Sequence, residues 1–157
     1  MYLYFMRHGQ AEQNVTIADE DRRLTPEGEQ RVGRAAQVLA QLKIRPEVIY
    51  ASPRVRAHQT AQIVAKALGM TVVVHPAVNF EFDLAAVRQF LADHPNAEAL
   101  MFVGHNPSME QVIGALTGAN VTLKPGSFAR VDVDPLGSLR GELVWLIAPK
   151  VFDSLND

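Results

Sequence analysis

The sequence predicts a three-layer α/β/α sandwich in which a mainly parallel central sheet is followed by a C-terminal β-hairpin. Strand-like apolar runs alternate with helix-like amphipathic segments along most of the chain, which is typical of parallel sheets. The last two apolar runs follow each other with only a turn between them, as in a hairpin. With 157 residues, 48% of them hydrophobic, the chain is expected to form one domain, 1–157, with residues 150–157 as a loose tail.

The expected strands are short runs of apolar and β-branched residues bounded by polar ones. Four of them should form the parallel part of the sheet, namely 1–6, 47–52, 71–75 and 99–104. The hairpin is expected from two further runs, 127–134 and 142–148.

The expected helices begin at capping residues or prolines and carry apolar residues three and four positions apart. The predicted starts are Thr25 with Pro26, Ser52 with Pro53, Asp83, and Asn106 with Pro107. Two of these helices should stop at Gly69 and Gly118. Residues 9–24 are expected to form a loop, and the charge run DEDRR within it to be solvated surface.

Composition excludes several classes of function. A net charge of −2 and a pI of about 6.2 give no reason to expect nucleic acid or an anionic membrane as a partner. The chain has no cysteine, which rules out disulfides, thiolate nucleophiles and thiolate metal sites. The sequence shows neither a targeting segment nor a long apolar span, so the cytoplasm is the expected compartment.

Three predicted strand ends carry unusual polar residues. The first strand runs into Arg7-His8-Gly9, the second into Ser52-Pro53-Arg54 with Arg56 close by, and the fourth into Gly104-His105-Asn106. Ligands of open α/β sheets bind beyond the carboxyl ends of the strands, so these segments should meet in one site.

This combination of residues suits a phosphoryl group. Guanidinium groups bind phosphate oxygens through paired donors, and glycines such as Gly9 would let a substrate approach the backbone closely. Histidines in zinc or iron sites usually have carboxylate or thiolate companions, whereas arginines repel a cation. No metal and no cofactor is therefore expected.

Together, RHG at the first strand end, SPRVRAHQTA after the second and VGHNP after the fourth resemble the histidine phosphatase superfamily, with its phosphoglycerate mutase-like fold. The short chain with LTPEG and LKPGS is most similar to SixA-type phosphohistidine phosphatases. This resemblance covers roughly residues 1–148. It implies that His8 is the nucleophile, that Arg7 and Arg54 clamp the phosphate, and that His105 hydrogen-bonds a phosphate oxygen.

The resemblance also raises two further candidates for binding the substrate. Arg22 stands where SixA-type sequences tend to have an arginine, although Arg23 or neither could fill that role. Asn14 stands where the mutase branch has a substrate-binding asparagine, and the alternative is a turn residue.

Mutase-like members generally supply an acidic proton donor from the loop after the third strand. Glu81, which lies between two phenylalanines, is the expected general acid, and Asp83 is the alternative, with helix capping as its structural role. The resemblance to SixA-type enzymes implies that this acid is not required, because an imidazole leaves more readily than an alkoxide. The expected substrate is therefore a phosphohistidine on a protein, and the alternative is a small phosphate ester.

Overall fold

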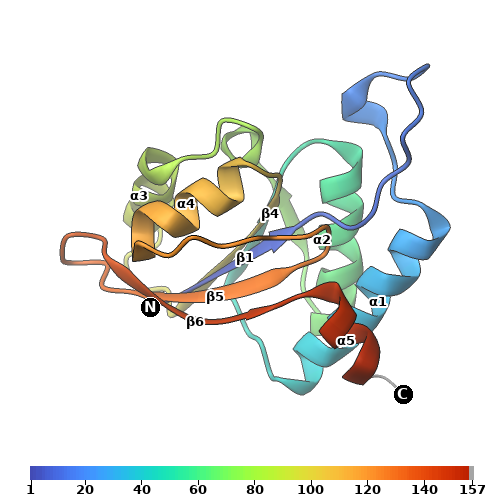
Figure 1. Ribbon diagram of the computed structural model, residues 1–157. Coiled ribbons are helices and arrows are strands. Elements are labelled where there is room, and N and C mark those ends of the chain that lie inside the picture. Colours follow the sequence, from blue (N-terminus) through green and yellow to red (C-terminus); the bar gives the residue numbers. More distant parts are fainter. Residues whose placement is uncertain (156–157) are drawn as a thin grey trace.

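A computed structural model describes residues 1–155 and contains a six-stranded sheet between two layers of helices (Figure 1). The strands are β1 (Tyr2–Arg7), β2 (Val48–Ala51), β3 (Val72–Val74), β4 (Ala99–Gly104), β5 (Phe128–Val133) and β6 (Gly141–Ile147). Their order across the sheet is β3-β2-β4-β1-β5-β6. The first four are parallel, whereas β5 and β6 form an antiparallel hairpin beside β1, so the predicted fold class is confirmed.

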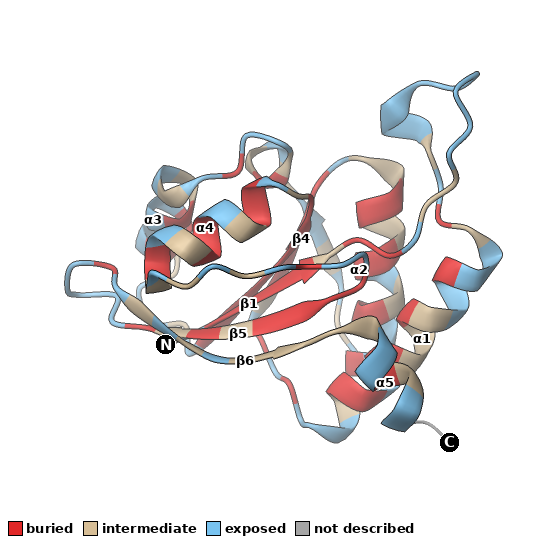
Figure 2. Cartoon of the chain, viewed as in Figure 1, coloured by how far each residue is buried: buried red, intermediate tan, exposed pale blue. Residues whose placement is uncertain are grey.

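Five α-helices cover the two faces of the sheet in the described part of the chain. They are α1 (Pro26–Gln41), α2 (Val55–Leu68), α3 (Leu84–Asp93), α4 (Ser108–Thr117) and α5 (Pro149–Leu155). Side chains of α1, α2 and α5 pack on one face, and those of α3 and α4 pack on the other, which gives two hydrophobic clusters with the sheet between them. The central strands β1 and β4 are buried on both faces (Figure 2).

Most predicted helix boundaries are confirmed. The Thr25 hydroxyl accepts a hydrogen bond from the Gly28 amide at 2.9 Å, and the Asp83 carboxylate accepts one from the Ala86 amide at 2.9 Å. The predicted start of α2 at Ser52 is wrong, because the helix begins at Val55 with Arg54 in the capping position. The Ser52 hydroxyl is engaged elsewhere, at the site described below.

The prediction of a loose tail over 150–157 is wrong for residues 150–155. These residues form most of α5, in which Phe152 is 1% exposed within the cluster that also holds α1 and α2. The Asp153 carboxylate makes ion pairs with Arg31 and Arg34 of α1. One apolar anchor and one carboxylate therefore dock this short helix; residues 156–157 lie outside the described part.

The carboxyl ends of β1, β2 and β4 lie at one edge of the sheet, as expected. Arg7 at the end of β1 pairs with Gly104 at the end of β4, and Ala51 at the end of β2 pairs with Val103. The His8 amide continues this ladder by donating to the Gly104 carbonyl at 3.0 Å. Within residues 1–155, none of the helices has the length and apolar character needed to cross a membrane.

Candidate functional site

His8 lies just beyond β1 and is held in one tautomer. Its Nδ1 atom is 2.7 Å from the Gly9 carbonyl oxygen. A carbonyl oxygen only accepts hydrogen bonds, so Nδ1 carries the proton and Nε2 keeps its lone pair. The Arg56 Nε–H group donates toward that Nε2 atom at 3.3 Å. The imidazole therefore presents an unprotonated nitrogen beside a guanidinium group.

The environment of His8 keeps its ring neutral. Burial, which leaves the residue 8% exposed, lowers the pKa of His8 to about 4. The hydrogen bond to Gly9 opposes this effect, while the positive charges of Arg56, Arg7 and Arg22 add to it. At neutral pH the ring is thus an uncharged nucleophile.

His105, from the loop after β4, faces His8 at a ring-centroid distance of 5.2 Å. Its Nε2 atom is 2.7 Å from the Ser52 hydroxyl, whereas its buried Nδ1 atom has no hydrogen-bond partner within residues 1–155. Burial and the nearby charges of His8, Arg56 and Arg54 lower the pKa of His105 to about 3. Buried polar atoms are normally satisfied, so the free Nδ1 atom indicates a place for a ligand.

Three arginines bring positive charge to the histidine pair. The Arg56 side chain is almost completely buried. Arg54 donates through Nε to Asn79 at 2.9 Å, and its guanidinium carbon lies 4.1 Å from the centre of the Phe80 ring. Arg7 donates to the Leu123 carbonyl at 2.8 Å, and its buried Nε atom has no partner among the described residues.

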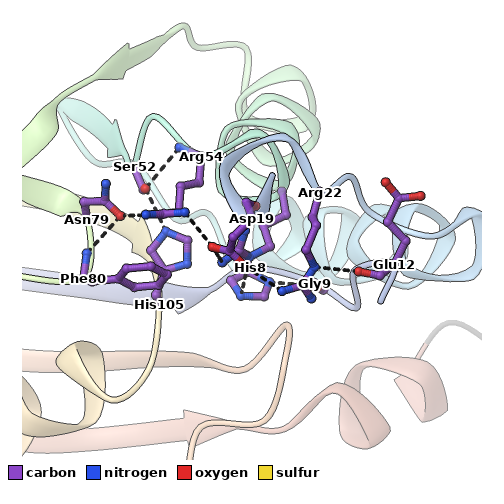
Figure 3. A network of polar contacts seen from close by, with 11 residues as sticks. His8, Gly9, Glu12, Asp19, Arg22, Ser52, Arg54, Asn79, Phe80 and His105 are labelled. Atoms are coloured by element: carbon purple, nitrogen blue, oxygen red, sulfur yellow. Dashed lines mark hydrogen bonds and ion pairs between the residues drawn. The ribbon is translucent and has the colours of Figure 1, made fainter. Parts of the chain in front are cut away.

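The Asp19 carboxylate lies among Arg54, Arg56 and a further arginine, Arg22 (Figure 3). It makes ion pairs with Arg22 at 2.8 Å, with Arg56 at 3.1 Å and with Arg54. Burial alone would raise the pKa of Asp19, but hydrogen bonds from Arg22 and Arg56 and the nearby positive charges hold it below its usual range. The expectation that this charge run is only solvated surface is therefore wrong for Asp19.

Gly9 is small for a different reason from the one predicted. A β-carbon at Gly9 would lie 2.5 Å from a methyl group of Val32, so the glycine makes room for α1 rather than for a substrate. The Gly9 amide donates to the Thr60 hydroxyl at 3.0 Å, and that hydroxyl donates to the Arg56 carbonyl at 2.7 Å. These bonds tie the backbone next to His8 to the first turns of α2.

The other predicted site residues have mixed outcomes. Arg22 reaches the site through Asp19, and its Nε atom donates to the Glu12 carbonyl, whereas Arg23 is exposed. Asn14 is an exposed turn residue whose side chain accepts hydrogen bonds from the amide and hydroxyl of Thr16.

The expected general acid is not supported by the geometry. Glu81 is exposed, and within the described chain no hydrogen bond or ion pair joins it to the residues around His8. Asp83 caps α3, which is the structural role proposed for it. The loop that is expected to supply an acid instead contributes Asn79, which accepts a hydrogen bond from Arg54, and Phe80, whose ring centre is 4.7 Å from that of His105.

Sequence reasoning placed Arg56 near the site without giving it a role, and it missed Asp19. The signal for Arg56 was its place in the first turn of the helix that follows β2, which directs it toward the sheet edge. Asp19 had no comparable signal, because only the path of the loop after β1 brings it over the arginines.

Known proteins are similar to this chain in sequence and in fold. The model of the histidine phosphatase superfamily (branch 1) matches residues 3–84. An uncharacterized protein of Picosynechococcus sp. is 38% identical over 133 residues, which are 79% of this chain and 80% of that protein.

Two solved structures extend this likeness over nearly the whole chain. The protein histidine phosphatase SixA complexed with tungstate has a TM-score of 0.86 at 24% identity, covering 96% of this chain and 98% of that one. A putative phosphohistidine phosphatase SixA from Agrobacterium tumefaciens has a TM-score of 0.81 at 24% identity, covering 94% and 98%. At these identities the structures establish a shared fold.

Proposed function

Because this chain belongs to the histidine phosphatase superfamily, we propose that it is a phosphatase that works through a covalent phosphohistidine intermediate on His8. The observation that carries the proposal is the bond from His8 Nδ1 to the Gly9 carbonyl, which leaves Nε2 unprotonated, with a lone pair that accepts a hydrogen bond from Arg56. A neutral imidazole held in this way has the protonation state that attack on phosphorus requires.

In the first step, His8 Nε2 attacks phosphorus and forms a P–N bond while the bond to the leaving group breaks. The electrons of that bond pass to the leaving group, which takes up a proton from solvent water. Arg7, Arg54 and Arg56 bind the phosphoryl oxygens, as phosphoryl transfer depends mainly on positioning and charge stabilisation. The Ser52 hydroxyl donates a hydrogen bond to His105 Nε2, so the ring proton of His105 is on Nδ1 and makes a hydrogen bond to a phosphoryl oxygen without being transferred.

In the second step, water attacks the phosphorylated His8 and releases inorganic phosphate. The P–N bond breaks, its electrons return to Nε2, and His8 regains its neutral form. The same donors that bind the phosphoryl group in the first step hold it for the attacking water.

For the substrate we propose a phosphohistidine on a protein, with small phosphate esters as the alternative. Glu81 is solvent-exposed, Asp83 caps a helix, and Asp19 is held in its ionised form, so none of these carboxyl groups is suited to protonate an alkoxide leaving group. An imidazole leaving group depends less on such an acid. The likeness to SixA-type structures favours the same substrate.

The substrate proposal is tested by comparing a phosphohistidine-bearing carrier protein with a panel of sugar phosphates. We expect kcat/KM to be at least about 100-fold higher for the carrier protein, a difference that differential transition-state binding can supply. Release of inorganic phosphate is measured for all substrates under the same conditions. Equal values of kcat/KM would exclude a preference for the protein substrate while leaving the phosphatase proposal intact.

The low pKa of His8 predicts an unusual acid limit of activity. Protonated His8 has no lone pair, so kcat/KM should fall as pH drops through about 4, and should show no His8 titration near the ordinary value of 6.5. The substrate is an aryl phosphate, and the measured kcat/KM is corrected for the ionisation of the phosphate group of the substrate itself. A midpoint near pH 6.5 that belongs to the free enzyme would contradict the buried, neutral state assigned to His8.

A further inference from the structure

We propose that the Asp19 carboxylate is an internal anion at the mouth of the phosphoryl site, and that the substrate's phosphoryl group displaces it together with residues 13–21. This inference rests on the proposed function, because it assumes that a phosphoryl group binds between His8 and the arginines. The new element is that the Asp19 carboxylate, a group of the chain itself, competes with the substrate's phosphoryl group for the arginines.

The contacts of Asp19 are those expected of a bound anion. Its Oδ2 atom accepts from Arg54 and from Arg56 Nη2, and its Oδ1 atom accepts from Arg22 at 2.8 Å. In addition, Arg56 Nη1 donates to the Asp19 backbone carbonyl at 2.8 Å. A carboxylate with several guanidinium partners offers the same kind of charged acceptor as a phosphate group.

Arg56 connects this anion to the nucleophile. Its Nε atom faces His8 Nε2 at 3.3 Å, while its Nη2 atom, on the same guanidinium plane, holds Asp19 at 3.1 Å. A phosphoryl group bonded to or approaching His8 Nε2 therefore has to share Arg56 with a carboxylate. Like charges at such short range repel each other strongly in a partly buried site, so the two anions exclude each other.

Residues 13–21, the segment that carries Asp19, are exposed and can move away from the site. Residues Asp19–Asp21 form a single 3-10 turn without any buried residue, and Val15 is 96% exposed. Among residues 1–155, the Asn14 side chain forms hydrogen bonds only within the segment, to Thr16. In Figure 1 the chain after β1 extends outward beyond the end of α2 before it returns to α1. The ion pairs of Asp19 and the bond from Arg56 to its backbone carbonyl thus hold this turn at the site, and an incoming phosphate competes for the same arginines.

The first test measures the affinity for inorganic phosphate by calorimetry in wild type, Asp19→Asn and Asp21→Asn. Loss of the competing charge should make Asp19→Asn bind phosphate about tenfold more tightly, the range expected when a partly exposed ion-pair network is removed. Asp21→Asn removes the same charge from the same turn without touching the arginines, and it should bind like wild type. Unchanged or weaker binding by Asp19→Asn would overturn the proposal, and weaker binding would identify Asp19 as a residue that positions the arginines.

A second test follows the segment directly and uses the absence of cysteine in the chain. A nitroxide spin label is attached to the Val15→Cys variant in which Asp19 is kept. The label should become more mobile when this protein is saturated with phosphate. In the Asp19→Asn background, the label should already be mobile without phosphate. A label on Leu136→Cys, which is 97% exposed in the turn between β5 and β6, serves as the control and should not respond. Displacement of the segment would be overturned if the mobility of the Val15 label were the same with and without saturating phosphate.

These measurements separate the inference from the function on which it rests. If wild type neither binds phosphate nor hydrolyses an aryl phosphate, the proposed function fails and the role of Asp19 fails with it. If wild type does both, and Asp19→Asn binds phosphate no more tightly, only the role of Asp19 is wrong.

Discussion

Replacing His8 with alanine should lower kcat for an aryl phosphate by at least about 10⁴-fold, the scale seen when a covalent nucleophile is removed. The reason is that no other side chain in the site combines a lone pair with a position beyond the end of β1. His105 is neutral as well, but its Nε2 atom is engaged with Ser52, and in the proposed mechanism its Nδ1 atom carries the ring proton and has no lone pair. Phosphate release under steady-state conditions measures the effect.

The variant needs controls for folding and for general histidine chemistry. His58→Ala, in the first turn of α2, should keep wild-type activity because the His58 side chain makes no hydrogen bond or ion pair with a residue of the proposed mechanism among those described. Thermal unfolding of His8→Ala should remain cooperative. In wild type, a rapid quench at alkaline pH should yield a phosphorylated peptide containing His8. Survival of substantial activity in folded His8→Ala, or a phosphorylated peptide from elsewhere, would show that the nucleophile is wrongly assigned.

The sequence was sufficient to predict the sheet and the edge at which the site forms. Runs such as 99–104 are buried on both faces, and a continuous apolar pattern of that length is what a central parallel strand requires. Polar residues directly after such strands have to meet at one edge, because parallel strands all end there. His8 and His105 could therefore be paired without knowledge of any contact between them.

Features that depend on the path of a loop or on one anchoring contact could not be predicted. Asp19 reads as one charge among several, and its role follows from the loop turning back over the arginines. Residues 150–155 read as a polar end, yet Phe152 and Asp153 suffice to dock them on α1. Neither case leaves a periodic pattern in the sequence. Glu81 is the expected general acid because it lies between two phenylalanines. Such an alternation does not determine whether the Glu81 side chain or its neighbours face the site.

The resemblance singles out Arg54 as a phosphate ligand and gives Arg56 no role. Because α2 begins at Val55 and not at the predicted Ser52, Arg54 is the capping residue at the rim and Arg56 turns inward. Arg56 is 3% exposed and touches His8, whereas Arg54 stacks on Phe80. Both belong to the site, but Arg56 contacts the nucleophile and Arg54 lies at the rim.

Alanine at Arg56 should therefore cost more than alanine at Arg54. We expect Arg56→Ala to lower kcat by about 10²–10³-fold, which is the usual loss for one preorganised donor to the transition state. Arg54→Ala should act mainly through KM, with a change of about tenfold, because a rim contact binds the ground state and the transition state alike. Steady-state kinetics of the two variants on one aryl phosphate measure both effects.

The geometry of the guanidinium, and not charge alone, should account for the loss at Arg56. Lysine at this position keeps the charge but cannot span His8 and a phosphoryl oxygen with two fixed donors, so Arg56→Lys should remain strongly impaired. Free guanidinium ion should partly restore kcat in Arg56→Ala by occupying the vacated space, and should do nothing for His8→Ala. Because Arg56 is buried, thermal unfolding of each variant is compared with wild type. Near-normal kcat in Arg56→Lys, or an equal loss in Arg54→Ala, would contradict the placement of Arg56 beside the reacting nitrogen.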